Sequence, residues 1–118
     1  VAREDCDNSD WKSACCTAAL AAMKAHGLKA PLLGALALEV AFIMPRLKGH
    51  FGTGRNAGVL KASAAAFPIT KPDRTKLLRC LEDSLTNLVW KDDAQIVGGN
   101  VEKRYGYPIG AQVSVAEV

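Results

Sequence analysis

The sequence is poor in the residues that mark several classes of protein. Only 6% of its 118 residues are aromatic, and it has two histidines and four cysteines. The cysteines form no C-x-x-C pair and lack a suitably spaced histidine, which argues against a zinc site. We expect buried or partly buried thiols in a reducing compartment rather than a disulfide framework, and we expect Trp11 and Trp90 in the core or at an interface. The cysteines are Cys6, Cys15, Cys16 and Cys80.

A long apolar run and a basic N-terminus are also missing. The most apolar stretch, residues 32–44, is interrupted by Glu39 and is shorter than the roughly 20 apolar residues that a membrane helix needs. The first residues are acidic, where a signal peptide is positively charged. The sequence therefore predicts a soluble, cytoplasmic protein without a membrane partner. Because it begins with Val, we expect either missing upstream residues or an unconventional start codon.

Positive charge is unevenly distributed, although the net charge is only +3. Residues 45–80 carry eight Lys or Arg and one acid, a balance of +7, whereas the rest carries seven bases and eleven acids, a balance of −4. This asymmetry is typical of a protein that binds a polyanion on one side. A solvated basic loop, or a loop that binds an acidic protein, is the alternative. The candidate DNA-binding residues are Arg46, Lys48, His50, Arg55, Lys61, Lys71, Arg74 and Lys76.

Two helices are predicted from caps and apolar spacing. Ser9 or Asp10 can cap an alanine-rich helix that ends at Gly27, a residue suited to a left-handed helix terminus. A regular leucine stripe predicts a second helix from Asp73, its capping residue, to about Asn87.

Strands are predicted where apolar residues alternate. Residues 36–43 and 111–118 alternate in this way, and residues 95–106 suggest a strand that is interrupted, with a bulge, at its Gly-Gly pair. Residues 45–72 contain several prolines and glycines without a regular period, so we expect a long, flexible, basic loop. The pattern predicts a single α+β domain over residues 1–118.

Acidic residues flank the second predicted helix. Mg²⁺ prefers oxygen ligands and commonly takes one or two carboxylates together with waters and substrate phosphate. Asp73 at the helix start and Asp92 or Asp93 on the following turn could converge on such an ion, which in a nuclease activates water and neutralises developing charge. The structural alternative is that Asp73 caps the helix and the aspartate pair binds turn amides.

The segment from Lys71 to Tyr105 resembles the RusA family of Holliday-junction resolvases. The resemblance lies in KPD-x-x-x-LLR-x-x-x-D-x-L, followed by VWKDDAQIV and VEKRYG. It implies a small α+β homodimer in which a mixed sheet packs against two helices. It also implies an endonuclease, often encoded by phages or prophages, that uses Mg²⁺, or Mn²⁺ in its place, to hydrolyse four-way DNA junctions in recombination and repair.

The resemblance also implies roles for individual residues. Asp73 matches the first acid of the family's D-x-D-N motif, and Asp93, with Asp92 beside it, matches the later acidic pair; these are the expected metal ligands. Arg79 stands at the position of a family lysine. Because arginine stays protonated, we expect it to clamp the scissile phosphate or to stabilise transition-state charge.

The sequence departs from the family pattern at two places. Thr75 replaces the second acid of the motif and Lys76 the common asparagine, so a negative ligand becomes a neutral hydroxyl. The alternative function is therefore a catalytically impaired protein that binds junctions or other DNA without cutting them. The second departure is that the opening strand of the family is not found before Asp10, so we expect that an N-terminal strand is lacking.

Overall fold

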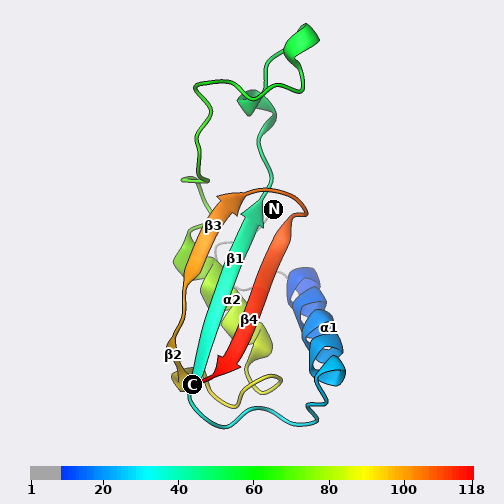
Figure 1. Cartoon of the computed structure of the whole chain (residues 1–118), viewed down its shortest axis with the longest axis vertical. Helices are drawn as coiled ribbons and strands as arrows, with labels where there is room; N and C mark the ends of the chain where they lie inside the picture. The colour runs from blue at the N-terminus through cyan, green and yellow to red at the C-terminus, as the bar shows by residue number, and fades with distance from the viewer. Residues whose placement is uncertain (1–8) are drawn as a thin grey trace.

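The sheet is built around one strand that is paired on both of its edges. In a computed structural model, which describes residues 9–118, this central strand is β1 (Leu36–Met44). β2 (Ile96–Gly98) and β3 (Val101–Tyr105) lie parallel to it in succession along one edge, and β4 (Gly110–Glu117) lies antiparallel along the other (Figure 1). The sheet is therefore mixed, as expected.

The central position of β1 explains its composition. Val40 pairs with Val101 of β3 and with Val113 of β4, so both edges of its backbone are hydrogen-bonded within the sheet. Its alternate side chains, beginning with Leu36 and Leu38, are buried against the helices. The alternation read from the sequence thus corresponds to a strand with one face in the core.

A close backbone approach separates β2 from β3. Gly99 has a φ of +116°, and a Cβ on it would lie 1.9 Å from the carbonyl oxygen of Leu38. Only glycine fits this position. Pairing resumes at once, since the Val40 amide donates to the Asn100 carbonyl at 2.9 Å. The predicted interruption is confirmed.

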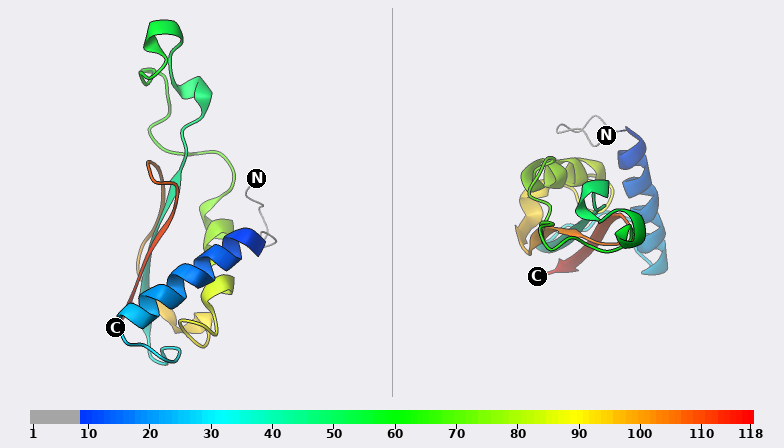
Figure 2. Two further views of the ribbon diagram at one scale, coloured as in Figure 1. Left: turned by 90° about the vertical axis from the view of Figure 1, so that its right-hand side faces the viewer. Right: turned by 90° about the horizontal axis from the view of Figure 1, so that it is seen from above.

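Both helices lie on one face of the sheet. α1 (Ser9–Ala25) and α2 (Arg74–Leu85) pack side by side on the same side of it (Figure 2). Gly27, with a φ of +71°, follows the end of α1 as predicted. The core between the helices and the sheet centres on Trp90 and Leu81, which are 0% and 1% exposed.

The opposite face of the sheet is largely polar, although Ile43 on it is buried. Its side chains include Glu39 of β1 and Glu102 and Arg104 of β3. Arg104 donates to Glu102 at 2.8 Å and to Gln112 at 3.2 Å, and Asn100 donates to Glu39 at 3.2 Å. These hydrogen bonds satisfy polar groups on a solvated surface, which is common where a sheet has helices on one side only.

Residues 45–72 form an arm that projects beyond the end of the sheet. The molecule measures 53 × 26 × 24 Å, and its radius of gyration of 16.6 Å exceeds the roughly 13.5 Å of a compact chain of this length. The arm contains the short 3₁₀ helices η1 (Lys48–His50) and η2 (Gly54–Asn56), and a bridge joins Phe51 to Leu60. The arm extends from β1 and returns to α2 (Figure 1).

Two further expectations concern membrane helices and the N-terminal strand. No helix in residues 9–118 is long and apolar enough to cross a membrane. The expected lack of an N-terminal strand concerns residues before Ser9, which lie outside the described part of the chain.

Candidate functional site

Helix α2 is charged against its own dipole. A helix has partial positive charge at its N-terminus, where acids stabilise it, and partial negative charge at its C-terminus, where bases do. α1 follows this rule with Asp10 in its first turn and Lys24 in its last, whereas α2 has no acid in its first turn and no base in its last. Apart from Asp73 at the N-cap, the charges of α2 thus oppose its dipole. Its N-terminal end carries Lys71, Arg74, Lys76 and Arg79, and its C-terminal end carries Glu82 and Asp83, with Asp92 and Asp93 following.

Asp73 occupies the N-cap position of α2 without acting as a side-chain cap. Its backbone is extended, with φ −77° and ψ 155°, but its carboxylate accepts no hydrogen bond from a helix amide. The Lys76 ammonium lies beside it, with Nζ 3.9 Å from Oδ1. The capping interpretation of Asp73 is therefore wrong for the side chain, and the carboxylate faces solvent beside a cation.

Arg79 and Thr75 lie on the exposed side of the first turns of α2. Thr75 is solvent-exposed, and Arg79 is exposed at the edge of a pocket described below. Arg74, one of the expected DNA-binding residues, instead donates to the carbonyl of Val101 at 3.2 Å. This bond ties the start of α2 to β3.

The aspartate pair has structural partners at the other end of the helix. Asp92 caps the short helix η3 (Asp93–Gln95) by accepting from the Ala94 amide at 3.0 Å. Asp93 accepts from the Thr86 hydroxyl at 2.8 Å. The structural interpretation of Asp92 as a turn residue is thus confirmed, and Asp93 is held against the end of α2.

Thr86 is the centre of this network and was not singled out from the sequence. Its hydroxyl also accepts from Nε1 of the buried Trp90 at 3.2 Å and lies 2.6 Å from the carbonyl oxygen of Glu82. One hydroxyl proton serves either the carbonyl or Asp93 at a time. The sequence signal for this network is that Thr86 and Trp90 are four residues apart and that an aspartate follows shortly after them.

The expected convergence of the acids does not occur within one copy of the chain. Asp73 precedes α2 and Asp93 contacts Thr86, which follows it. The 12 residues of the helix rise about 18 Å, far beyond the reach of one ion. Accordingly, no three His, Cys, Asp or Glu side chains in residues 9–118 are placed to hold a metal ion. The prediction overlooked the rigid helix between the two motifs.

Acidic groups at the C-terminal end of α2 repel one another. Burial raises the pKa of Glu82 above its ordinary value, and the carboxylates of Asp93 and Asp83 raise it further. This end of the helix is therefore a region of accumulated negative potential, in contrast to the cationic N-terminal end.

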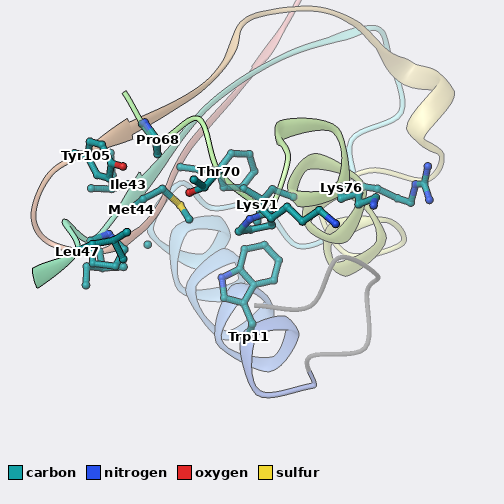
Figure 3. Close-up of a pocket in the computed structure, with 16 residues that line it drawn as sticks. Trp11, Ile43, Met44, Leu47, Pro68, Thr70, Lys71, Lys76 and Tyr105 are labelled. Atoms are coloured by element: carbon teal, nitrogen blue, oxygen red, sulfur yellow. The ribbon is translucent and has the colours of Figure 1, made fainter. Parts of the chain in front are cut away.

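A pocket opens where the arm meets the sheet and the start of α2. Its volume is about 1050 Å³, and its wall is mostly apolar. Trp11 enters it from α1 and Met44 from β1, while Lys71 and Lys76 border it on the α2 side (Figure 3). Sequence reasoning missed this site because its lining comes from four separate segments.

Tyr105 anchors the base of the arm at one wall of the pocket. The Arg46 guanidinium lies 4.1 Å from the centre of its ring, and the His50 imidazole meets the ring edge-on at 5.2 Å between centroids. Arg46 also donates to the carbonyl of Ala65, and His50 Nδ1 accepts from the Leu47 amide at 3.3 Å. Both side chains thus hold the arm in place, and their expected contact with DNA stays a prediction.

The other expected DNA-binding residues lie at the same end of the molecule. Lys48, Arg55 and Lys61 are exposed on the arm. Lys103, which the sequence did not single out, donates to the Thr70 carbonyl at 2.7 Å and joins β3 to the returning chain.

The thiols are as expected within the described residues. Cys15, Cys16 and Cys80 are free, and each is buried or partly buried; Cys6 lies outside the described part. Cys16 donates to the Ser84 carbonyl at 3.2 Å, between α1 and α2. Burial raises the pKa of Cys15 to about 11, and electrostatic interactions with Cys16 and Cys80 contribute less to this rise. It is therefore protonated and unreactive at neutral pH.

Comparison with known proteins connects this arrangement to a family. A relative described as "Uncharacterized protein YqaN", from Bacillus subtilis (strain 168), is 37% identical over 51 residues, covering 43% of this chain and 36% of that protein. The chain thus matches about a third of that relative's length. No solved structure gives a significant match. The family model for "Endodeoxyribonuclease RusA" matches residues 3–116. Since this match spans nearly the whole chain, the protein belongs to the RusA family of endodeoxyribonucleases.

Proposed function

We propose that this protein hydrolyses phosphodiester bonds at four-way DNA junctions, with Mg²⁺ or Mn²⁺ as cofactor, in recombination and repair. The family match over residues 3–116 carries the proposal, because that family implies Holliday-junction endonuclease activity. The cationic end of α2 supports it, since DNA phosphates suit such a surface. The proposed setting is the cytoplasm of a bacterial host, with the gene carried by a phage or prophage.

The N-terminal end of α2 has two properties that favour a phosphate. Its amides carry partial positive charge, and Lys76 and Arg79 add full charges within the first two turns. Arg79 holds the scissile phosphate and stabilises charge that develops on its oxygens, and its permanent protonation excludes a role as proton donor. Asp73, exposed at the cap, is the acid nearest to this phosphate position.

The metal site that the family implies cannot be completed within one copy. Asp73 supplies one carboxylate and Thr75 a neutral hydroxyl, while Asp93 is a helix length away. Mg²⁺ requires compact, near-octahedral oxygen coordination, so these residues of a single chain do not fit it.

A homodimer resolves this separation. If two copies place their α2 helices antiparallel, the cationic N-terminal end of one faces the acidic C-terminal end of the other. Asp73 of one copy would then lie near Asp93 of its partner. The opposed charges of the two ends and the opposed helix dipoles both favour this arrangement.

The experiment is cleavage of a labelled four-way junction, with linear duplex of the same sequence as control, in Mg²⁺, Mn²⁺ or chelator. Metal-dependent nicking of the junction that Asp93→Asn abolishes supports the proposal. Nicking of both substrates alike, or nicking in chelator, contradicts it.

The second candidate is a junction-binding protein that has lost catalysis. Thr75 favours it, because a neutral hydroxyl stands where the family has a carboxylate. Tight junction binding without nicking would support this candidate. Thr75→Asp should then raise metal affinity and restore cleavage, and unchanged activity in that variant would show that position 75 is not a depleted ligand.

A further inference from the structure

The pocket at the base of the arm combines an apolar wall with charges of one sign. Its interior is formed by apolar and aromatic side chains, among them Trp11, Phe42 and Met44. Its volume of about 1050 Å³ is just above the range for small-molecule sites, which run from roughly 300 to 1,000 Å³. An exposed hollow of this composition is typical of a site that binds a ligand with apolar surface.

The charged side chains of the pocket are all cationic. Lys71, Lys76 and Arg79 line the side formed by α2 and the segment before it, and no carboxylate of the described residues lines any part. Arg79 has no hydrogen bond or ion pair with another described residue. A matching ligand therefore has a flat or apolar body and an anionic group attached to it.

We infer that this pocket binds one unstacked nucleotide of the DNA, with its base against the apolar wall and its phosphate on the cationic side. The inference rests on the proposed function, since it assumes a DNA substrate. A base displaced at the branch point of a junction has this chemistry, because it has lost a stacking neighbour and keeps its phosphate. The pocket thus selects DNA with accessible bases over continuous duplex.

The aromatic rings of the pocket have different roles. Tyr105 has the Arg46 guanidinium over its ring, so its position is set by the arm. Phe42 is 2% exposed and has no face open to a base. Trp11 packs against the core on one side but is only partly buried, and it projects into the pocket from α1 (Figure 3). Trp11 is therefore the ring on which the base stacks, an interaction that typically changes affinity by about 10- to 100-fold.

Tryptophan fluorescence provides a direct test. The chain has two tryptophans, and Trp90 is 0% exposed, so quenching by a ligand reports on Trp11. The whole chain is titrated, in chelator, with a four-nucleotide oligothymidylate, with its abasic counterpart and with inorganic phosphate. We expect saturable quenching by the oligothymidylate, with an affinity about 10-fold or more above that of the abasic strand.

Matched variants locate the site. Ile109→Glu and Leu47→Glu place a negative charge on pocket residues that are 56% and 57% exposed, so folding should be retained, as checked by thermal unfolding. Each should weaken oligothymidylate binding about 10-fold or more. Val97→Glu makes the same change at a residue of β2 that is 63% exposed and far from the pocket, and it should leave binding unchanged.

The outcomes separate this inference from the proposed function. Equal affinity for abasic and thymidylate strands, or equal effects of Ile109→Glu and Val97→Glu, would overturn the nucleotide pocket even if junctions are cleaved. Base-dependent quenching that is lost in Ile109→Glu supports the pocket even if no cleavage occurs, in which case only the proposed catalysis fails.

Discussion

The two ends of α2 differ in charge, in packing and in how their side chains are used. At the N-terminal end, Asp73 and Arg79 are exposed beside an open, apolar pocket. At the C-terminal end, the Thr86 hydroxyl donates to Asp93 and accepts from the buried Trp90. Polar groups that satisfy one another stabilise a fold, whereas polar groups left facing solvent remain available for a ligand.

The comparison also shows that a motif near in sequence is not near in space. The helix start and the aspartate pair belong to one recognisable pattern, but a rigid helix holds them apart. The largest expected effect tests whether a second copy brings them together.

Asp73→Asn and Asp93→Asn should each reduce junction cleavage by about 100-fold or more, because each removes a charge from the proposed site. Mixing the two variants and allowing subunits to exchange should restore cleavage. A heterodimer would pair the unaltered Asp73 of one copy with the unaltered Asp93 of the other. The measurement is nicking of a labelled junction at varied mixing ratios; no recovery in a mixture shown to contain heterodimers would rule out sites shared between copies.

Thr86→Val should destabilise the protein by about 1–3 kcal/mol, since the Nε1 group of buried Trp90 loses its acceptor. Thr75→Val, at the opposite end of the same helix, should change stability by about 0.5 kcal/mol or less because Thr75 is exposed. Chemical denaturation measures both. Equal effects would mean that the two ends do not differ in packing as described.

Replacing Lys48, Arg55 and Lys61 of the arm together by Ala should flatten the salt dependence of junction binding. If each contacts one phosphate, the slope of log K against log salt should fall by up to about 0.9 per residue. A triple alanine variant of Lys24, Lys29 and Lys91, exposed residues outside the arm, is the control. An unchanged slope in the arm variant would show that the arm does not contact the DNA backbone.

The smallest expected effect concerns Glu82. Because its pKa is raised in the folded protein, folding is opposed above that pKa, and the penalty disappears as pH falls below the ordinary pKa of glutamate. Glu82→Gln should therefore stabilise the protein near neutral pH, by about 0.5 kcal/mol or less since solvent screens this partly exposed group. Unfolding at pH 7 and pH 4 measures the difference, and Glu117→Gln, exposed on β4, is the control. A gain that persists at pH 4 would exclude the burial and repulsion of the Glu82 charge as its cause.

Several elements could be predicted because their causes are local. The leucine stripe of α2, the alternation of β1 and the break at Gly99 depend on neighbouring residues and appear where expected. The basic residues of the segment 45–80 also lie together in the structure, on the arm and at the start of α2.

The contacts within the candidate site could not be predicted because they join distant segments. Arg46 and His50 looked like free basic residues, but Tyr105, more than fifty residues away, binds both. The pocket likewise depends on Trp11, which the alanine-rich pattern of its helix gives no reason to place beside the arm.

The sequence by itself determined the helices, the strands, the opposite charge at the two ends of α2 and the membership of a nuclease family, because these follow from local propensity, hydrophobic period and motif. Tertiary structure alone decided which charged groups are neighbours. The parallel pairing of β1 and β3 requires α2 to run back along the sheet, with Asp73 at one end of the helix and Asp93 at the other. Chain topology thus separates what sequence proximity had joined.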